Sequence, residues 1–82
     1  MNNDDNNYQP ISCELYSEYE LAIIRNQKIK LVWQVGEQIH IGIIKPLDLQ
    51  THEHQEFLIG QNHQKRLHKI RLDHIRSQEF IG

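Results

Sequence analysis

Tyrosines and carboxylates gather between positions 8 and 24 of the chain. A tyrosine offers a large rigid apolar surface and a hydroxyl, and a neighbouring carboxylate can pair with Lys or Arg on another molecule. This is the chemistry of a contact surface, and it predicts a recognition segment for a basic partner. We assign contact roles to Tyr8, Glu14 and Glu18, and we expect Tyr19 in the core. The full set is Tyr8, Glu14, Tyr16, Glu18, Tyr19 and Glu20.

A basic run near the other end of the chain could contact RNA phosphates. Its members are Lys65, Arg66, Lys69 and Arg71. The other interpretation is a solvated edge strand whose charges deter edge-to-edge pairing. We favour the solvated strand, because nucleic-acid-binding domains usually have a pI above about 9 and this chain has a pI of 6.3. Aromatic residues are also missing from the run. RNA binding remains the alternative function.

The histidines invite a metal site, with His52 and His54 as the tightest pair. No cysteine or second histidine pair follows at the spacing usual for zinc, so we expect no metal and no cofactor. The chain also lacks a nucleophile elbow, a Gly-rich phosphate loop and a paired-acid signature, so we expect no enzyme. Cys13 lies near a predicted helix start, and we expect a partly buried, inert thiol there.

Length and composition set broad limits. With 82 residues the chain forms one domain, and such a domain buries about 60–65% of the surface that its unfolded chain exposes. The lone Cys13 cannot form an internal disulfide and the chain does not open like a signal peptide, which favours the cytoplasm. No apolar run approaches the roughly 20 residues of a membrane span. The net charge is −2, with the acidic residues concentrated at the beginning of the chain.

The N-terminal part predicts a tail and then one helix. Residues 1–7 contain no apolar residue after Met1, so we expect a disordered tail and a single domain over residues 8–82. Ser12 is a good helix cap, and Ser17 with Glu20 has the form of a capping box. The sequence thus offers two helix starts, and a turn from Ser12 that leads into a helix from Ser17 would reconcile them. The helix is expected to stop at Asn26. An apolar stripe at helical spacing comprises Leu15, Tyr19, Ala22 and Ile23.

The rest of the chain alternates with a period of two, which indicates strands. A turn at residues 36–37 joins the first two into a hairpin, and we expect strong bending or close backbone approach at Gly42. Pro46 ends or bends the second strand, and residues 47–55 are expected to form a loop. The predicted fold is mainly β with one N-terminal helix, an Sm-like, strongly bent, five-stranded sheet or barrel. Its strands are expected near residues 28–35, 39–43, 56–60, 66–72 and 75–81.

Several of these stretches are shared with one known family. The chain resembles the Rho-binding antiterminators, the Rof/YaeO type of inhibitor of transcription termination factor Rho. The opening Tyr-Gln-Pro-Ile-Ser-Cys of residues 8–13 is the most specific match. Further matches are Tyr16, the Glu-Leu-Ala of residues 20–22, the turn at residues 36–37 and the Ile-Arg-Leu-Asp-His-Ile of residues 70–75.

The resemblance implies a monomeric protein inhibitor without catalysis. Members of the family bind the N-terminal RNA-binding domain of Rho and occupy the primary site where nascent RNA would load. The acidic N-terminal segment is the candidate contact surface, with no direct binding of nucleic acid. Ser12 stands where the family commonly has Asn, and Leu15 and Ser17 stand where it often has acids. The expected contact residues are Tyr8, Gln9, Pro10, Ser12, Cys13, Glu14, Tyr16 and Glu20, with Glu18 added from its charge.

Overall fold

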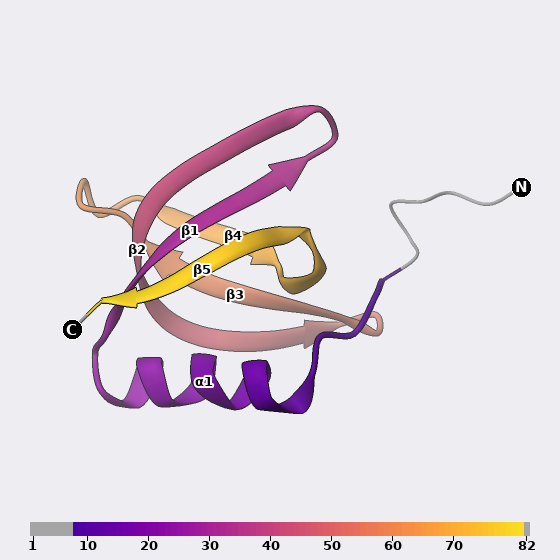
Figure 1. Cartoon of the computed structure of the whole chain (residues 1–82), viewed down its shortest axis with the longest axis horizontal. Helices are drawn as coiled ribbons and strands as arrows, with labels where there is room; N and C mark the ends of the chain where they lie inside the picture. Colours follow the sequence, from indigo (N-terminus) through magenta and orange to yellow (C-terminus); the bar gives the residue numbers. More distant parts are fainter. Residues whose placement is uncertain (1–7, 82) are drawn as a thin grey trace, which may run out of the picture.

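One helix precedes five antiparallel strands in the computed structural model, which describes residues 8–81 (Figure 1). The strand order is β4-β3-β2-β1-β5, and the strongly bent sheet stays open rather than closing into a barrel. The predicted fold class, mainly β with one N-terminal helix, is confirmed. The predicted tail lies outside the described residues. The elements are α1 (Cys13–Ile24), β1 (Lys28–Val35), β2 (Gln38–His52), β3 (Gln55–Gln61), β4 (Leu67–Arg71), the 3-10 turn η2 (Leu72–His74) and β5 (Ile75–Ile81).

Helix α1 begins at the first of the two starts that the sequence offers. The hydroxyl of Ser12 accepts a hydrogen bond from the backbone N–H of Leu15 at 3.1 Å, so Ser12 is the N-cap. The alternative start at Ser17 is wrong, because the cap at Ser12 already satisfies the first turn and Ser17 lies inside the helix. The predicted stop is confirmed: Asn26 has a left-handed φ of 54°, and α1 ends at Ile24. No helix among residues 8–81 is long and apolar enough to cross a membrane.

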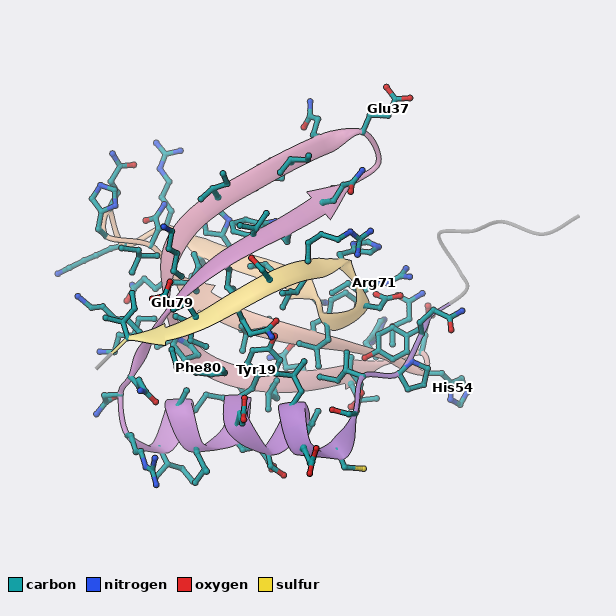
Figure 2. All side chains as sticks on the ribbon, viewed as in Figure 1. Tyr19, Glu37, His54, Arg71, Glu79 and Phe80 are labelled. Atoms are coloured by element: carbon teal, nitrogen blue, oxygen red, sulfur yellow. The ribbon has the colours of Figure 1, made fainter. Side chains whose placement is uncertain are left out.

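The core lies between α1 and the concave side of the sheet. Tyr19 and Ala22 of α1 are fully buried, and Leu15 and Ile23 pack against them, which confirms the predicted apolar stripe. Figure 2 shows the side chains of Tyr19 and Phe80 in the space between α1 and β5, with ring centroids 5.9 Å apart. The sheet and η2 supply the other buried hydrophobic residues of the core: Ile29, Leu31, Trp33, Ile44, Leu58 and Ile70 from the strands and Leu72 from η2.

Strand β2 is much longer than predicted. Its first half pairs with β1 and its second half pairs with β3, so residues 47–52 belong to a strand. The predicted loop is therefore wrong. The sequence predicted a loop because most of these side chains are polar. Pairing with β3 instead satisfies their backbone N–H and C=O groups. The register shifts between Pro46 and Asp48, so Pro46 marks the bend in β2 without ending it.

The close approach that the sequence predicts at Gly42 occurs at Gly60 instead. A Cβ atom on Gly60 would collide with the side chain of Ile44, whereas one on Gly42 would make an ordinary contact with Trp33. The later predictions are closer to the structure. β4 ends at Arg71, the chain turns through Asp73 and His74, and the last strand follows as expected.

Candidate partner-binding surface

The chain before α1 is attached to the sheet at two points. The Tyr8 hydroxyl donates a hydrogen bond to Oε1 of Glu56 on β3 at 3.1 Å. The backbone N–H of Gln9 donates to Oδ2 of Asp73 in η2 at 3.0 Å. Residues 8–12 therefore lie beside residues 71–73, although more than 60 positions separate Gln9 from Asp73 in the sequence. These two hydrogen bonds fix the direction in which the chain enters α1.

A nearly buried ion pair supports this attachment. Nε of Arg71 donates to Oδ1 of Asp73 and Nη2 donates to Oδ2, both at 2.7 Å. The side chains are 9% and 7% exposed. The guanidinium also lies 5.8 Å from the centre of the Tyr8 ring. Burial alone would raise the pKa of Asp73, but the hydrogen bonds from Arg71 and Gln9 outweigh it and hold the pKa below its usual range.

Carboxylates from three elements meet beside α1. A cleft of about 280 Å³ between α1 and β2 is lined by Tyr16, Glu20 and Asp48, together with apolar side chains. Burial raises the pKa of the Tyr16 hydroxyl, and the negative charges of Glu56, Glu20 and Asp48 raise it further. These three carboxylates are thus close enough to act on one tyrosine. The sequence did not point to Asp48 or Glu56, because no local motif links them to α1.

The predicted contact residues fall into two groups. Tyr8 and Tyr16 are half-buried, so each offers only part of its ring to a partner. Ser12 is exposed, but its hydroxyl already accepts the capping hydrogen bond. The expected burial of Cys13 is wrong, because the first turn of α1 presents it to solvent. The other contact residues have exposed side chains: Gln9, Pro10, Glu14, Glu18 and Glu20.

Tyr19 belongs to the fold rather than to the surface. It is fully buried, as the sequence predicted. Burial, with a further contribution from the charge of Glu18, raises the pKa of its hydroxyl to about 12. The Tyr19 hydroxyl donates to Oε1 of Gln78 on β5 at a long 3.5 Å. Its role is to tie α1 to the sheet.

The basic run does not form one surface. Lys65 and Arg66 are exposed on the loop between β3 and β4, and Nζ of Lys69 lies 4.5 Å from the centre of the Phe57 ring. Arg71 is buried in its pair with Asp73. A phosphate could reach Arg71 only by breaking that pair. The alternative RNA-binding set is therefore reduced to three residues on two elements.

The histidines are spread over the molecule. His52 and His54 are exposed at the turn between β2 and β3, where Glu53 and His54 have positive φ values of 50° and 66°. In the described part of the chain, no group of three His, Cys, Asp or Glu side chains could hold a metal ion. Two other histidines flank Trp33: the His40 ring stacks on it at 5.3 Å, and the His68 ring meets it edge-on at 5.8 Å.

The fold and the surface together define a small bent β-sheet domain that presents an acidic helical segment. No protein-family model and no curated protein matches the chain. A solved structure, proteasome accessory factor B/C (PafBC) of Arthrobacter aurescens, is similar to it with a TM-score of 0.75 and 19% identity. The match covers 90% of this chain and 12% of that chain. At this identity the likeness shows the fold alone.

Proposed function

We propose that this protein inhibits transcription termination factor Rho. It binds the N-terminal RNA-binding domain of Rho through the acidic face of its N-terminal segment and so blocks the loading of RNA. It acts in the cytoplasm as a monomer, without catalysis and without a cofactor. The sequence stretches that resemble Rho-binding antiterminators motivate the proposal, and the surface around α1 supports it.

The observation that carries the proposal is a set of carboxylates that form no ion pair with the described residues. Glu14, Glu18 and Glu20 are exposed on α1, and Asp48 on β2 lines the same cleft as Glu20. Among residues 8–81, none of these four carboxylates forms an ion pair. A groove that binds single-stranded RNA is lined by positive charge. An acidic surface of this kind is complementary to such a groove, and complementarity of charge favours fast and specific association.

The attachment of residues 8–12 to the rest of the fold is a second feature that supports the proposal. Tyr8 and Gln9 are held by Glu56 and Asp73, so the start of α1 has a fixed orientation before any partner binds. A surface that is ordered in advance loses less conformational entropy on binding. Residues 8–13, the most specific stretch of the family resemblance, contact residues 70–75, a further stretch of it. Their contact explains how a motif at the end of the chain can support a surface at its beginning.

Competition with RNA tests the proposal. Fluorescent oligocytidylate RNA is bound to Rho, and this protein is titrated into the complex while anisotropy is recorded. We expect the anisotropy to fall to the value of free RNA, because both ligands occupy the same groove. A parallel titration of the RNA without Rho should leave the anisotropy unchanged. Undiminished binding of RNA by Rho at saturating protein would refute the proposal.

Charge-reversed variants locate the surface. The double variant Glu14→Lys/Glu18→Lys should weaken competition by at least about tenfold, since it replaces attraction by repulsion at two positions. The matched control, Lys65→Glu/Arg66→Glu, reverses two exposed charges on the β3–β4 loop. We expect it to compete as well as the unmodified protein. The opposite ranking would move the interface to the basic loop, and circular dichroism would verify that both variants fold.

A further inference from the structure

A second charged site lies at the end of the molecule away from the N-terminal segment. Three lysines, Lys28, Lys45 and Lys65, line one cavity of about 260 Å³. Gln61, Asn62 and His63 also line it. Among residues 8–81, no carboxylate belongs to this lining. The sequence alone does not indicate the site, because its lysines lie far apart in the chain.

The sheet brings two of these lysines together. Ile29 pairs with Ile44 in the antiparallel register of β1 and β2. Extending this register by one residue places Lys28 opposite Lys45, on the same face of the sheet. Like charges directly opposite each other destabilise a sheet. In the stretch from residue 8 to residue 81, neither lysine has an acidic partner within ion-pair distance. An anion bound between them would remove the repulsion.

The third lysine stands on a loop with a fixed backbone. Oδ1 of Asn62 accepts hydrogen bonds from the backbone N–H groups of Gln64 at 2.9 Å and Arg66 at 3.0 Å. The backbone of Asn62 also bonds to Lys65 and Arg66, and Lys65 has a left-handed φ of 64°. The loop is therefore ordered by its own hydrogen bonds. It holds Lys65 at the cavity while leaving its ammonium group free to bind.

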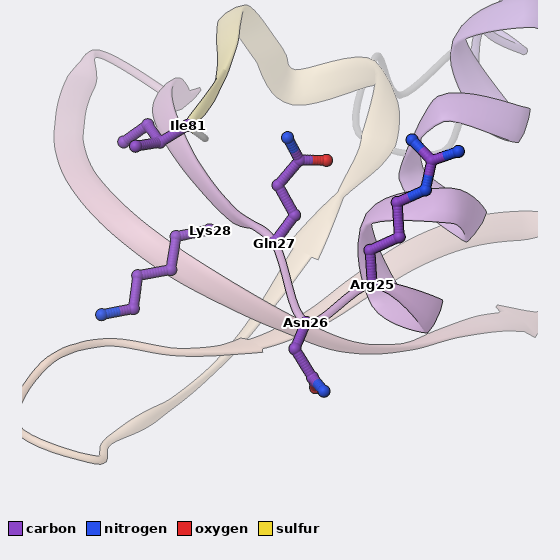
Figure 3. Close-up of a pocket in the computed structure, with 5 residues that line it drawn as sticks. All are labelled: Arg25, Asn26, Gln27, Lys28 and Ile81. Carbon is purple, nitrogen blue, oxygen red and sulfur yellow. The ribbon is translucent and has the colours of Figure 1, made fainter.

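A neighbouring cleft enlarges the positive region. This cleft has a volume of about 430 Å³ and shares Lys28 with the lysine cavity. Figure 3 shows its lining, with Gln27 between Arg25 and Lys28 at the junction of α1 and β1. Like the lysine cavity, it is lined by no carboxylate from the described part of the chain. Arg25 thus adds a fourth cation within the same end of the molecule.

We propose that the cavity formed by Lys28, Lys45 and Lys65 binds a compact phosphate-bearing ligand, such as the diphosphate or triphosphate group of a nucleotide. Ammonium groups and the imidazole and amide N–H groups are suitable donors to phosphate oxygens. The cations surround one cavity instead of following a line. Within residues 8–81, no Phe, Tyr or Trp lines either cleft, so these residues provide no such ring on which the bases of a nucleic acid strand could stack. Both features favour a compact anion over a strand.

Titration of inorganic pyrophosphate into ¹⁵N-labelled protein tests this site. We expect saturable shifts of the amide resonances of residues 28, 45 and 61–65, and of the Gln61 and Asn62 side-chain amides. The variant Lys28→Gln/Lys45→Gln should bind about tenfold or more weakly, since it removes two charge-assisted contacts. The matched control is Lys30→Gln/Lys69→Gln, which removes the same charge outside the cavity and should keep the affinity.

Parallel titrations with ADP and with oligocytidylate RNA distinguish the source of the phosphate. Binding of ADP at least as tight as that of pyrophosphate would support a nucleotide ligand. RNA that binds more tightly per phosphate than pyrophosphate would overturn the compact ligand in favour of a strand. Shifts that rise linearly without saturation, or equal loss in both double variants, would show general screening of charge and overturn the site. These measurements contain no Rho, so their outcome is independent of the proposed inhibition.

Discussion

The two charged ends of this molecule differ in whether their charged side chains pair with each other. Around the start of α1, the buried charges of Arg71 and Asp73 satisfy each other, and the carboxylates of Glu14, Glu18 and Glu20 are exposed. At the other end, Lys28, Lys45 and Lys65 face one cavity that has no acid among its described lining residues. The first arrangement stabilises the fold and orients a surface. The second opposes the fold slightly and favours a bound anion. Internal pairing thus separates structural charges from those available to a ligand.

Breaking the buried pair should have the largest effect on stability. Arg71→Met leaves the carboxylate of Asp73 almost buried without its partner, and such a loss costs about 3 kcal/mol. Urea unfolding followed by tryptophan fluorescence measures the change. Arg66→Met is the control, because Arg66 is exposed on a loop, and we expect a change within about 0.5 kcal/mol. An equal change in the free energy of unfolding for both substitutions would mean that the buried ion pair does not stabilise the fold.

Low pH should weaken the same ion pair between Arg71 and Asp73. The folded-state pKa of Asp73 is lowered, so its stabilising contribution is complete above the unfolded-state value of about 3.9 and is lost as the pH falls through the lower folded-state pKa. Urea midpoints measured from about pH 5 to pH 2 should therefore decrease. Asp73→Asn should flatten this decrease. Asp48→Asn, at an exposed carboxylate, should leave it unchanged, and an equal flattening would locate the acid sensitivity elsewhere.

The attachment of the N-terminal segment has a smaller expected effect. Tyr8→Phe removes the hydroxyl that donates to Glu56, and one such hydrogen bond contributes about 1 kcal/mol. Thermal or urea unfolding measures the loss. Tyr16→Phe is a suitable control, since the Tyr16 hydroxyl makes no hydrogen bond to any residue from 8 to 81. A larger loss for Tyr16→Phe would contradict the assigned role of Tyr8.

The smallest expected effect is a gain in stability at the basic end. Lys28→Gln removes the repulsion with Lys45, so the free energy of unfolding should rise by about 0.3 kcal/mol. Lys30→Gln, on the same strand, should act in the opposite direction, because Lys30 lies opposite Glu79 in the pairing of β1 with β5. Urea unfolding at low salt compares the two variants. Equal changes of the same sign would argue against repulsion inside the cavity.

Local patterns predicted most of the elements correctly. The alternation from Lys28 to Val35, the turn that follows and the left-handed stop at Asn26 each depend on neighbouring residues, and the structure contains all three. The errors arose where two local signals competed or where distant residues decided. Ser12 and Ser17 both looked like caps, and the stretch after Pro46 looked like a loop until pairing with β3 made it a strand.

The sequence by itself determined the apolar stripe of α1, the succession of one helix and five strands along the chain, and the acidic character of residues 8–24. Only the tertiary structure decided which charges remain available to a ligand. It paired Arg71 with Asp73, gathered Asp48 and Glu56 around Tyr16, and brought Lys28 beside Lys45. The physical reason is that helix caps and strand alternation depend on neighbours in the chain, whereas charge compensation depends on side chains that only the register of distant strands brings together.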